Sequence, residues 1–260
     1  MTRRVVRYGQ RRGQLGELWR PAAPTHSERD LPVVVLIHGG FWRSQYTKVL
    51  MRRLARSVIE HGWAAWNIEY ARVGPFGGGG GWPTTFEDVA AAVDELARFD
   101  GIDLDRVVTC GHSAGGQLAL WLAARSQSRG DGPGGVAQVP VCAAVSLAGV
   151  VDLRAAFEQG GRGGAVAKLL GGAPAEVPER YDSVSPIELL PLGVPQVLVH
   201  GLADEVVAPA VSEGYVIQAV SAGDDAVFVG IPDAGHRDML RPTGPGWSAA
   251  LGHIQQVFNG

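Results

Sequence analysis

The chain has 260 residues, of which 46% are hydrophobic and 19% charged, a balance typical of a soluble globular protein with a large core. Its formal net charge of −3 gives no basic footprint for nucleic acid. The basic N-terminus lacks the apolar core of a secretory signal, and no apolar run is long enough for a membrane span. We therefore expect a cytoplasmic protein without nucleic-acid or membrane partners. Its oligomeric state stays open, with a homodimer as one alternative.

Two local features of the composition bear on function. An arginine cluster near the N-terminus is interpreted as a solvated surface, and it comprises Arg3, Arg4, Arg7, Arg11 and Arg12. Cys110 and Cys142 lie in apolar runs, where free cysteine behaves as a small buried hydrophobe. Two isolated cysteines form neither a disulfide framework nor a metal-ligand spacing, so no metal site is expected.

Apolar runs of strand type alternate along the chain with longer segments of helical period. This alternation predicts an α/β fold with a mostly parallel central sheet of about eight strands and helices on both faces. The predicted strands are Leu15 to Trp19, Val33 to Ile37, Ala64 to Glu69, Val107 to Cys110, Ala143 to Leu147, Gln196 to His200 and Ala226 to Gly230.

Helices are predicted between these strands, and two segments interrupt the alternation. The predicted helices are Tyr46 to Glu60, Thr85 to Phe99, Ala114 to Ala124, Ala210 to Val220 and Ala249 to Val257. The interruptions are a glycine-rich loop at 72–82 and a stretch of short helical pieces around 152–190. Because long insertions tend to be functional, we expect a pocket loop and a small cap on a single domain, residues 1–260.

The stretch VVTCGHSAGGQ places Ser113 between two glycines, directly after a predicted strand and before a predicted helix. In a chain with 37 glycines, a G-x-S-x-G string is weak evidence by itself. Its context is informative, because a serine on a strand–turn–helix corner projects at the carboxyl edge of the sheet. Gly111, Gly115 and Gly116 allow a strained turn and close helix packing. Ser113 is therefore the predicted nucleophile.

A serine nucleophile needs a general base, and three histidines follow Ser113 in the chain. His236 follows the last predicted strand on a turn-forming loop, which is where this topology places the base. His200 ends a strand, which favours a structural role. His253 lies within the terminal helical pattern, where it faces solvent or packs.

The base in turn needs an acid that orients it, and chain order places this acid between the serine and the histidine. Asp204 lies just beyond the strand that precedes the last one, so it is the predicted acid. Glu205 and Asp152 are the alternatives. Asp224 and Asp225 are less suitable because they precede a strand.

Acyl transfer also requires N–H donors for the developing oxyanion. The stretch VVVLIHGGFW runs from a strand into two glycines, so it can present bare backbone amides at the same sheet edge. Gly40 is the first choice for a donor, Phe41 or Gly39 is the second, and the N–H of Ala114 completes the predicted oxyanion hole. The alternative is a simple Gly-Gly turn.

Aromatic residues near these motifs are candidates for the substrate pocket, although aromatics more often serve packing. The candidates are Phe41, Trp42, Phe76 and Trp82, and His112 beside the nucleophile is added to them. Trp82 follows five glycines and precedes a proline, which favours a mobile pocket wall.

Four motifs in order and spacing resemble the α/β-hydrolase superfamily and, within it, the HGG-x-W branch. They are HGGFW at 38–42, GHSAGG at 111–116, HGLADEVV at 200–207 and DAGH at 233–236, and the similarity covers most of the chain. Kynurenine formamidases (arylformamidases), related carboxylesterases and hydrolase domains similar to prolyl oligopeptidases carry such motifs.

The resemblance implies a Ser-His-Asp hydrolase that cleaves a small carboxylic ester or an aryl formamide through Ser113, His236 and Asp204, without metal or organic cofactor. Arg237 departs from the branch, in which a small or aromatic residue follows the histidine. Its guanidinium either favours an anionic substrate or faces solvent.

Three other functions are alternatives. A peptidase or amidase of prolyl-oligopeptidase-like type uses the same site, and a non-catalytic binding module can share the fold. A nucleotide-binding protein is disfavoured because GGGGGWPTT lacks the G-K-[ST] ending of a phosphate-binding loop and GGRGGAVAKLL does not follow a strand.

Overall fold

Runs of β-branched and other apolar residues form the central strands, as expected where helices cover both faces of a sheet. The computed structural model describes residues 1–22, 30–127, 130, 132–161 and 163–260. The strands in these segments are β1 (Thr2–Arg7), β2 (Leu15–Arg20), β3 (Leu31–Ile37), β4 (Ala64–Ile68), β5 (Ile102–His112), β6 (Ala143–Leu147), β7 (Gln196–Gly201) and β8 (Ala226–Ile231).

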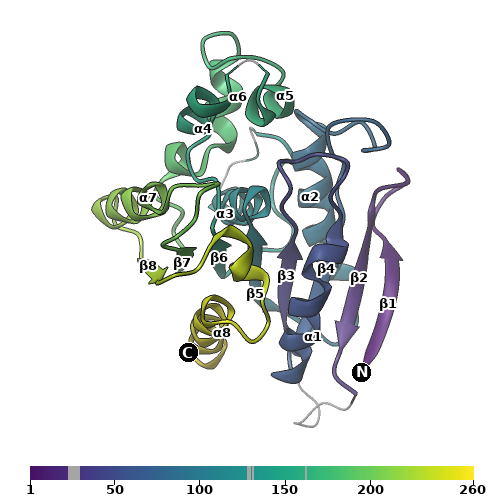
Figure 1. The fold of residues 1–260 in the computed structure, drawn as a ribbon. Coiled ribbons are helices and arrows are strands. Elements are labelled where there is room, and N and C mark those ends of the chain that lie inside the picture. The colour runs from purple at the N-terminus through teal and green to yellow at the C-terminus, as the bar shows by residue number, and fades with distance from the viewer. Residues whose placement is uncertain (23–29, 128–129, 131, 162) are drawn as a thin grey trace.

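Within the described residues, these strands form one eight-stranded sheet in the order β1-β2-β4-β3-β5-β6-β7-β8 (Figure 1). β2 is antiparallel to both of its neighbours, and the other neighbouring pairs are parallel. The predicted α/β fold with a mostly parallel sheet is therefore confirmed.

Helices cover the sheet on both faces (Figure 1). They are α1 (Arg52–Glu60), α2 (Thr84–Asp94), α3 (Ala114–Gln127), α4 (Leu153–Gly160), α5 (Ala165–Leu170), α6 (Pro178–Val184), α7 (Pro209–Ser221) and α8 (Pro245–Asn259), with 3₁₀ helices η1 (Lys48–Met51), η2 (Glu95–Arg98), η3 (Pro186–Leu189) and η4 (His236–Leu240). One core cluster joins the sheet to α2, α3 and α7, and the other joins it to α1 and α8. None of the described helices has the length and hydropathy needed to cross a bilayer.

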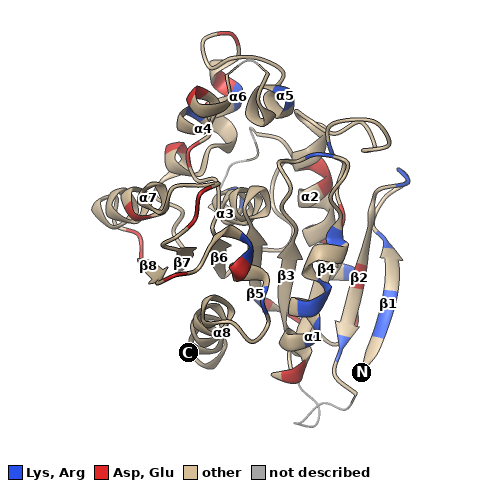
Figure 2. Cartoon of the chain, in the orientation of Figure 1, with Lys and Arg blue, Asp and Glu red and all other residues tan. Residues whose placement is uncertain are grey.

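The first strand is the main element that the sequence did not predict. β1 is exposed at five of its six positions, and three arginines of the N-terminal cluster, Arg3, Arg4 and Arg7, lie on it (Figure 2). The interpretation of these arginines as surface residues agrees with their exposure, but they belong to an edge strand that pairs with β2. Cys110 and Cys142 are free, and burial raises the pKa of the Cys110 thiol.

The parallel order brings the carboxyl ends of β3, β5, β6, β7 and β8 to one edge of the sheet. Ile37 pairs with Gly111 and His112 with Leu147, so these strands end at nearly the same level. The short helices α4, α5 and α6 of the 152–190 segment lie beyond this edge (Figure 1). The loops that follow the strands therefore meet beneath these three helices.

Candidate active site

Ser113 occupies a strained corner between β5 and α3. Its φ of +56° lies in the left-handed region, which non-glycine residues seldom adopt, and the residue is 3% exposed. Its N–H donates to the Leu147 carbonyl at 2.8 Å, which ties the corner to β6. This conformation turns the chain sharply from strand to helix, as the predicted nucleophile motif requires.

Asp204, in the loop after β7, accepts hydrogen bonds on both carboxylate oxygens. Oδ2 accepts the Nδ1–H of His236 at 2.7 Å, and Oδ1 accepts the amides of Val206 and Val207 at 2.8 and 3.0 Å. The Asp204 side chain is fully buried. Burial opposes its ionisation, but the bonds from Val207, His236 and Val206 outweigh this effect and lower the pKa of Asp204. A charged carboxylate is thus held against the histidine.

Neither alternative acid occupies this place. Glu205 is exposed, and Asp152 caps α4 by accepting the Ala155 amide at 2.9 Å. In the hydrogen bonds of the described residues, Asp204 is the carboxylate that bonds to His236.

His112 connects the candidate nucleophile to the candidate base. Its Nε2–H donates to the His236 carbonyl at 2.9 Å, and the two rings lie 4.7 Å apart. Burial, followed by the charge of His236, lowers the pKa of His112 to about 4, so it is a neutral donor near pH 7. Among the described residues, no hydrogen bond joins the Ser113 hydroxyl to the His236 ring. Tightening of this contact on substrate binding is common in hydrolases.

The glycine loop after β3 lies against Ser113. A Cβ added at Gly39 would lie 2.5 Å from the His112 carbonyl oxygen and 3.0 Å from the Ser113 Cβ. Gly40 and Phe41 follow with φ of +113° and +57°. Within the described part of the chain, the N–H groups of Gly39, Gly40, Phe41 and Ala114 have no hydrogen-bond acceptor. These free donors are what an oxyanion hole requires.

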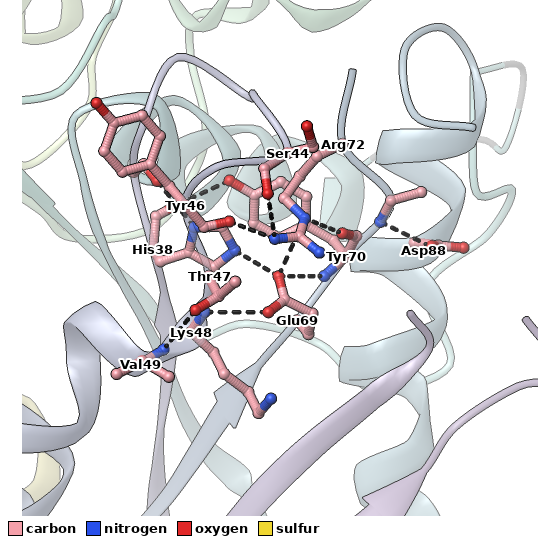
Figure 3. A network of polar contacts seen from close by, with 12 residues as sticks. His38, Ser44, Tyr46, Thr47, Lys48, Val49, Glu69, Tyr70, Arg72 and Asp88 are labelled. Atoms are coloured by element: carbon pink, nitrogen blue, oxygen red, sulfur yellow. Dashed lines mark hydrogen bonds and ion pairs between the residues drawn. The ribbon is translucent and has the colours of Figure 1, made fainter. Parts of the chain in front are cut away.

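A buried polar network beneath this loop holds it in place (Figure 3). His38 is fully buried, and its Nδ1 and Nε2 lie 2.8 Å from the Gly39 carbonyl and 2.7 Å from Glu69 Oε1. Glu69 Oε1 also lies 3.3 Å from Arg72 Nε, and Arg72 donates to the Tyr46 carbonyl. Burial opposes ionisation of Glu69, but the hydrogen bond and charge of His38 and the charge of Arg72 lower its pKa.

A cavity of about 270 Å³ adjoins the loop, and two of the predicted pocket residues line it. Phe41 is 41% exposed at its edge, whereas Trp42 is 2% exposed and donates from Nε1 to Gln117 Oε1 at 3.1 Å. The other lining residues belong to the loops that follow β3, β6 and β7, to α4, to α5 and the residue before it, and to α7: Arg43, Val150, Asp152, Ala155, Ala156, Gln159, Gly160, Gly164, Ala165, Val166, Val206, Val207 and Val211.

The other predicted pocket residues lie elsewhere. Neither Phe76 nor Trp82 is among the described residues that line this cavity. Phe76 is fully exposed. The ring centroids of Trp82 and Phe86 lie 5.9 Å apart, and the backbone N–H of Trp82 donates to the Leu169 carbonyl of α5 at 2.7 Å. The carboxyl end of the 72–82 loop thus contacts α5. Arg237 is exposed at the surface.

Sequence reasoning missed the buried supporting residues. Glu69, Tyr70 and Arg72 follow the apolar strand β4 directly, and Asp88 lies inside α2, where it accepts the Ala71 amide at 2.9 Å. Charged residues immediately after a buried strand were the available signal. Among the described residues, no group of three or more His, Cys, Asp or Glu side chains has an arrangement that could hold a metal ion.

The sheet and its topology define an α/β-hydrolase fold, and solved esterase structures share it. A truncated carbohydrate esterase from gut microbiota has 20% identity and a TM-score of 0.85, covering 100% of this chain and 97% of that one. Esterase B from Lactobacillus rhamnosis has 21% identity and a TM-score of 0.82, covering 99% and 85%. Esterase Est2 from Thermogutta terrifontis, bound to butyrate, has 20% identity and a TM-score of 0.76, covering 98% and 92%.

The sequence profile of the BD-FAE family matches residues 22–216. The chain therefore belongs to the BD-FAE family, a carboxylesterase family of the α/β-hydrolase class. No curated protein matches the chain. The finer assignment to the HGG-x-W branch stays a prediction.

Proposed function

We propose that the chain is a serine esterase in which Ser113 is the nucleophile, His236 the general base and Asp204 the acid that orients it. The observation that carries this proposal is the buried Asp204 carboxylate bound to His236 Nδ1, with Ser113 on a strained turn beside the free amides of the glycine loop. Four separate loops supply these groups, which agrees with a hydrolase site rather than a non-catalytic binding module.

The proposed reaction has two steps. His236 accepts the Ser113 hydroxyl proton from the nucleophile as Oγ attacks the acyl carbonyl, and the amides of Ala114 and the glycine loop stabilise the oxyanion. Collapse of the tetrahedral intermediate releases the alcohol, which takes the proton from His236, and leaves an acyl-enzyme. A water molecule then gives a proton to His236 and attacks the acyl carbonyl. When this second intermediate collapses, Ser113 takes the proton back from His236 and the carboxylic acid is released. Asp204 stabilises the charged imidazole in both steps.

The proposed substrate is a small carboxylic ester or an aryl formamide. The 270 Å³ cavity supports a small acyl or alcohol group, because Ala155, Ala156 and Val207 give it an apolar wall. Arg43 and Asp152 add polar groups at the same cavity, which can bond to hydroxyls. With a carbohydrate esterase among the similar structures, an acylated sugar is the ester that we favour. Peptide-bond cleavage of prolyl-oligopeptidase-like type is the alternative.

A fluorophosphonate probe tests the nucleophile. We expect the wild-type chain to be labelled and Ser113→Ala to lose labelling and at least about 10³-fold in ester hydrolysis. Ser146→Ala is the matched control, since Ser146 is 1% exposed on the neighbouring strand and its hydroxyl has no hydrogen-bond partner among the described residues. Labelling that persists in Ser113→Ala would show that another residue is the nucleophile.

A substrate comparison tests the ester assignment. Short and medium p-nitrophenyl esters, an acetylated sugar, N-formylkynurenine and a proline-containing dipeptide amide would be compared by kcat/KM. We expect the short esters and the acetylated sugar to be the best substrates. A preference for N-formylkynurenine would shift the assignment to a formamidase, and a preference for the dipeptide amide would overturn it.

A further inference from the structure

His200 is a fully buried histidine that the proposed reaction does not use. It lies near the end of β7, and its Nε2 is 3.1 Å from Asp204 Oδ2 and 3.0 Å from the Val207 carbonyl. Its Nδ1 lies 2.8 Å from the hydroxyl of Ser212 on α7. Two histidines, His200 and His236, thus contact the same carboxylate oxygen.

These contacts fix the tautomer of His200. Both oxygens that face Nε2 can only accept a hydrogen bond, because they belong to a carboxylate and a carbonyl, so the proton lies on Nε2. Nδ1 then accepts from Ser212, whose hydroxyl can donate. Burial lowers the pKa of His200 despite the opposing charge of Asp204, which keeps the ring neutral.

The arrangement gives Asp204 four donors, with two amides on Oδ1 and two imidazoles on Oδ2. From this geometry we propose that His200 is a positioning residue for the candidate Ser-His-Asp triad, because its Nε2–H fixes the Asp204 carboxylate and weakens its attraction for the proton on His236. This inference rests on the proposed function of Ser113, His236 and Asp204. A carboxylate with fewer donors is a stronger base.

Among the described residues, the charges that act on His200 are those of Asp204 and His236. His112 faces His236 from β5, and α7 contributes the neutral Ser212. On η4, Asp238 forms an ion pair with Arg241 at 2.9 Å and accepts the Gly235 amide. A change in the pH profile on replacement of His200 therefore reports on the Asp204 and His236 pair.

The test compares His200→Met, which removes the donor, with His200→Gln, whose side-chain amide can still donate to Asp204. For His200→Met we expect the acidic limb of the kcat/KM profile to move up by about half to one pH unit, since Asp204 then holds protonated His236 more strongly. At a pH on the acidic side of this limb, the kcat/KM of His200→Met should be about 3- to 10-fold lower than that of the wild-type chain. His200→Gln should keep the wild-type limb, as should His253→Met, a matched control on α8.

A second measurement does not depend on activity. In the wild-type chain with ¹⁵N-labelled histidine, the His200 signals, assigned through His200→Gln, should show the neutral Nε2–H tautomer at pH 7 and above. An unshifted acidic limb in a folded His200→Met, or an Nδ1–H tautomer, would overturn the positioning role. Wild-type hydrolysis that does not require Ser113 would instead overturn the proposed function, and the tautomer would remain measurable.

Discussion

Tyr70 shows how one hydroxyl supports the candidate oxyanion loop. It donates to the His38 carbonyl at 2.8 Å, and its ring stacks on the His38 ring with the centroids 4.4 Å apart. Both residues are fully buried, and burial raises the pKa of Tyr70, so its hydroxyl stays a donor. The residue before Gly39 is therefore held by a neutral hydrogen bond as well as by Glu69.

We expect Tyr70→Phe to lower kcat about tenfold with little change in KM, because loop amides that lose their alignment stabilise the transition state less. The unpaired His38 carbonyl should also lower the free energy of unfolding by about 1–3 kcal/mol. Steady-state kinetics and urea unfolding measure the two effects.

Tyr215→Phe is the control for Tyr70→Phe. The buried hydroxyl of Tyr215 donates to Gln196 Oε1 at 2.6 Å, at the start of β7 and away from the candidate site at its carboxyl end. It should lose similar stability and keep kcat. Equal kcat in both variants and the wild-type chain would contradict a role of Tyr70 in the loop.

Among the elements, the β5–α3 corner depends on close backbone packing. A Cβ at Gly111 would lie 1.9 Å from the Gly115 carbonyl oxygen, and one at Gly115 would lie 2.1 Å from the Ile37 carbonyl oxygen. Real Cβ atoms do not approach backbone oxygens so closely. Glycine at these places therefore lets α3 begin directly against β3 and β5, which turns Ser113 toward the sheet edge.

Gly111→Ala should lower the free energy of unfolding by about 3 kcal/mol or more and abolish hydrolysis, since backbone must move to admit the methyl group. Gly214→Ala provides the opposite case, because nothing lies within 4 Å of its added Cβ in the interior of α7. It should raise stability by about 0.4–1 kcal/mol. Urea unfolding of both variants checks this contrast, and a stable, active Gly111→Ala would contradict it.

The elements also show where sequence reasoning works. The strands that pair on both sides were predictable because their continuous apolar runs, as in Val33 to Ile37, are typical of a sheet covered on both faces. β1 was not predictable, since its exposed arginines show no apolar face and only pairing with β2 makes it a strand. The candidate Ser113, Asp204 and His236 followed from chain order, whereas Glu69 and His200 gain their partners only in the tertiary structure.

At the scale of the whole molecule, buried neutral histidines make stability depend on pH. The pKa of His112 falls from an ordinary 6.5 to about 4 on burial, and burial also lowers the pKa of His200. Because these folded-state values lie below the unfolded ones, protonation favours unfolding. The stabilising contribution is complete above about pH 6.5 and is lost as the pH falls toward 4. The lowered pKa of Asp204 extends the same trend to lower pH.

The free energy of unfolding should therefore fall between pH 6.5 and 4, with about 3 kcal/mol of the loss due to His112. Urea unfolding at pH 7, 6, 5 and 4 measures this loss. His112→Gln, which cannot titrate, should show a shallower decline, although it starts from a lower stability. Parallel declines in the two proteins would show that His112 does not contribute.

The dispersal of the candidate site over the sequence has a consequence for folding. Gly39, Ser113, Asp204 and His236 follow four different strands, and they meet only when β8 has paired with β7 at the far edge of the sheet. Contacts between residues so distant in the chain form late, because closing long loops costs entropy before it brings any stabilisation. On the proposed assignment of Ser113, Asp204 and His236, a chain emerging from the ribosome gains hydrolytic capacity only when its last strand is in place.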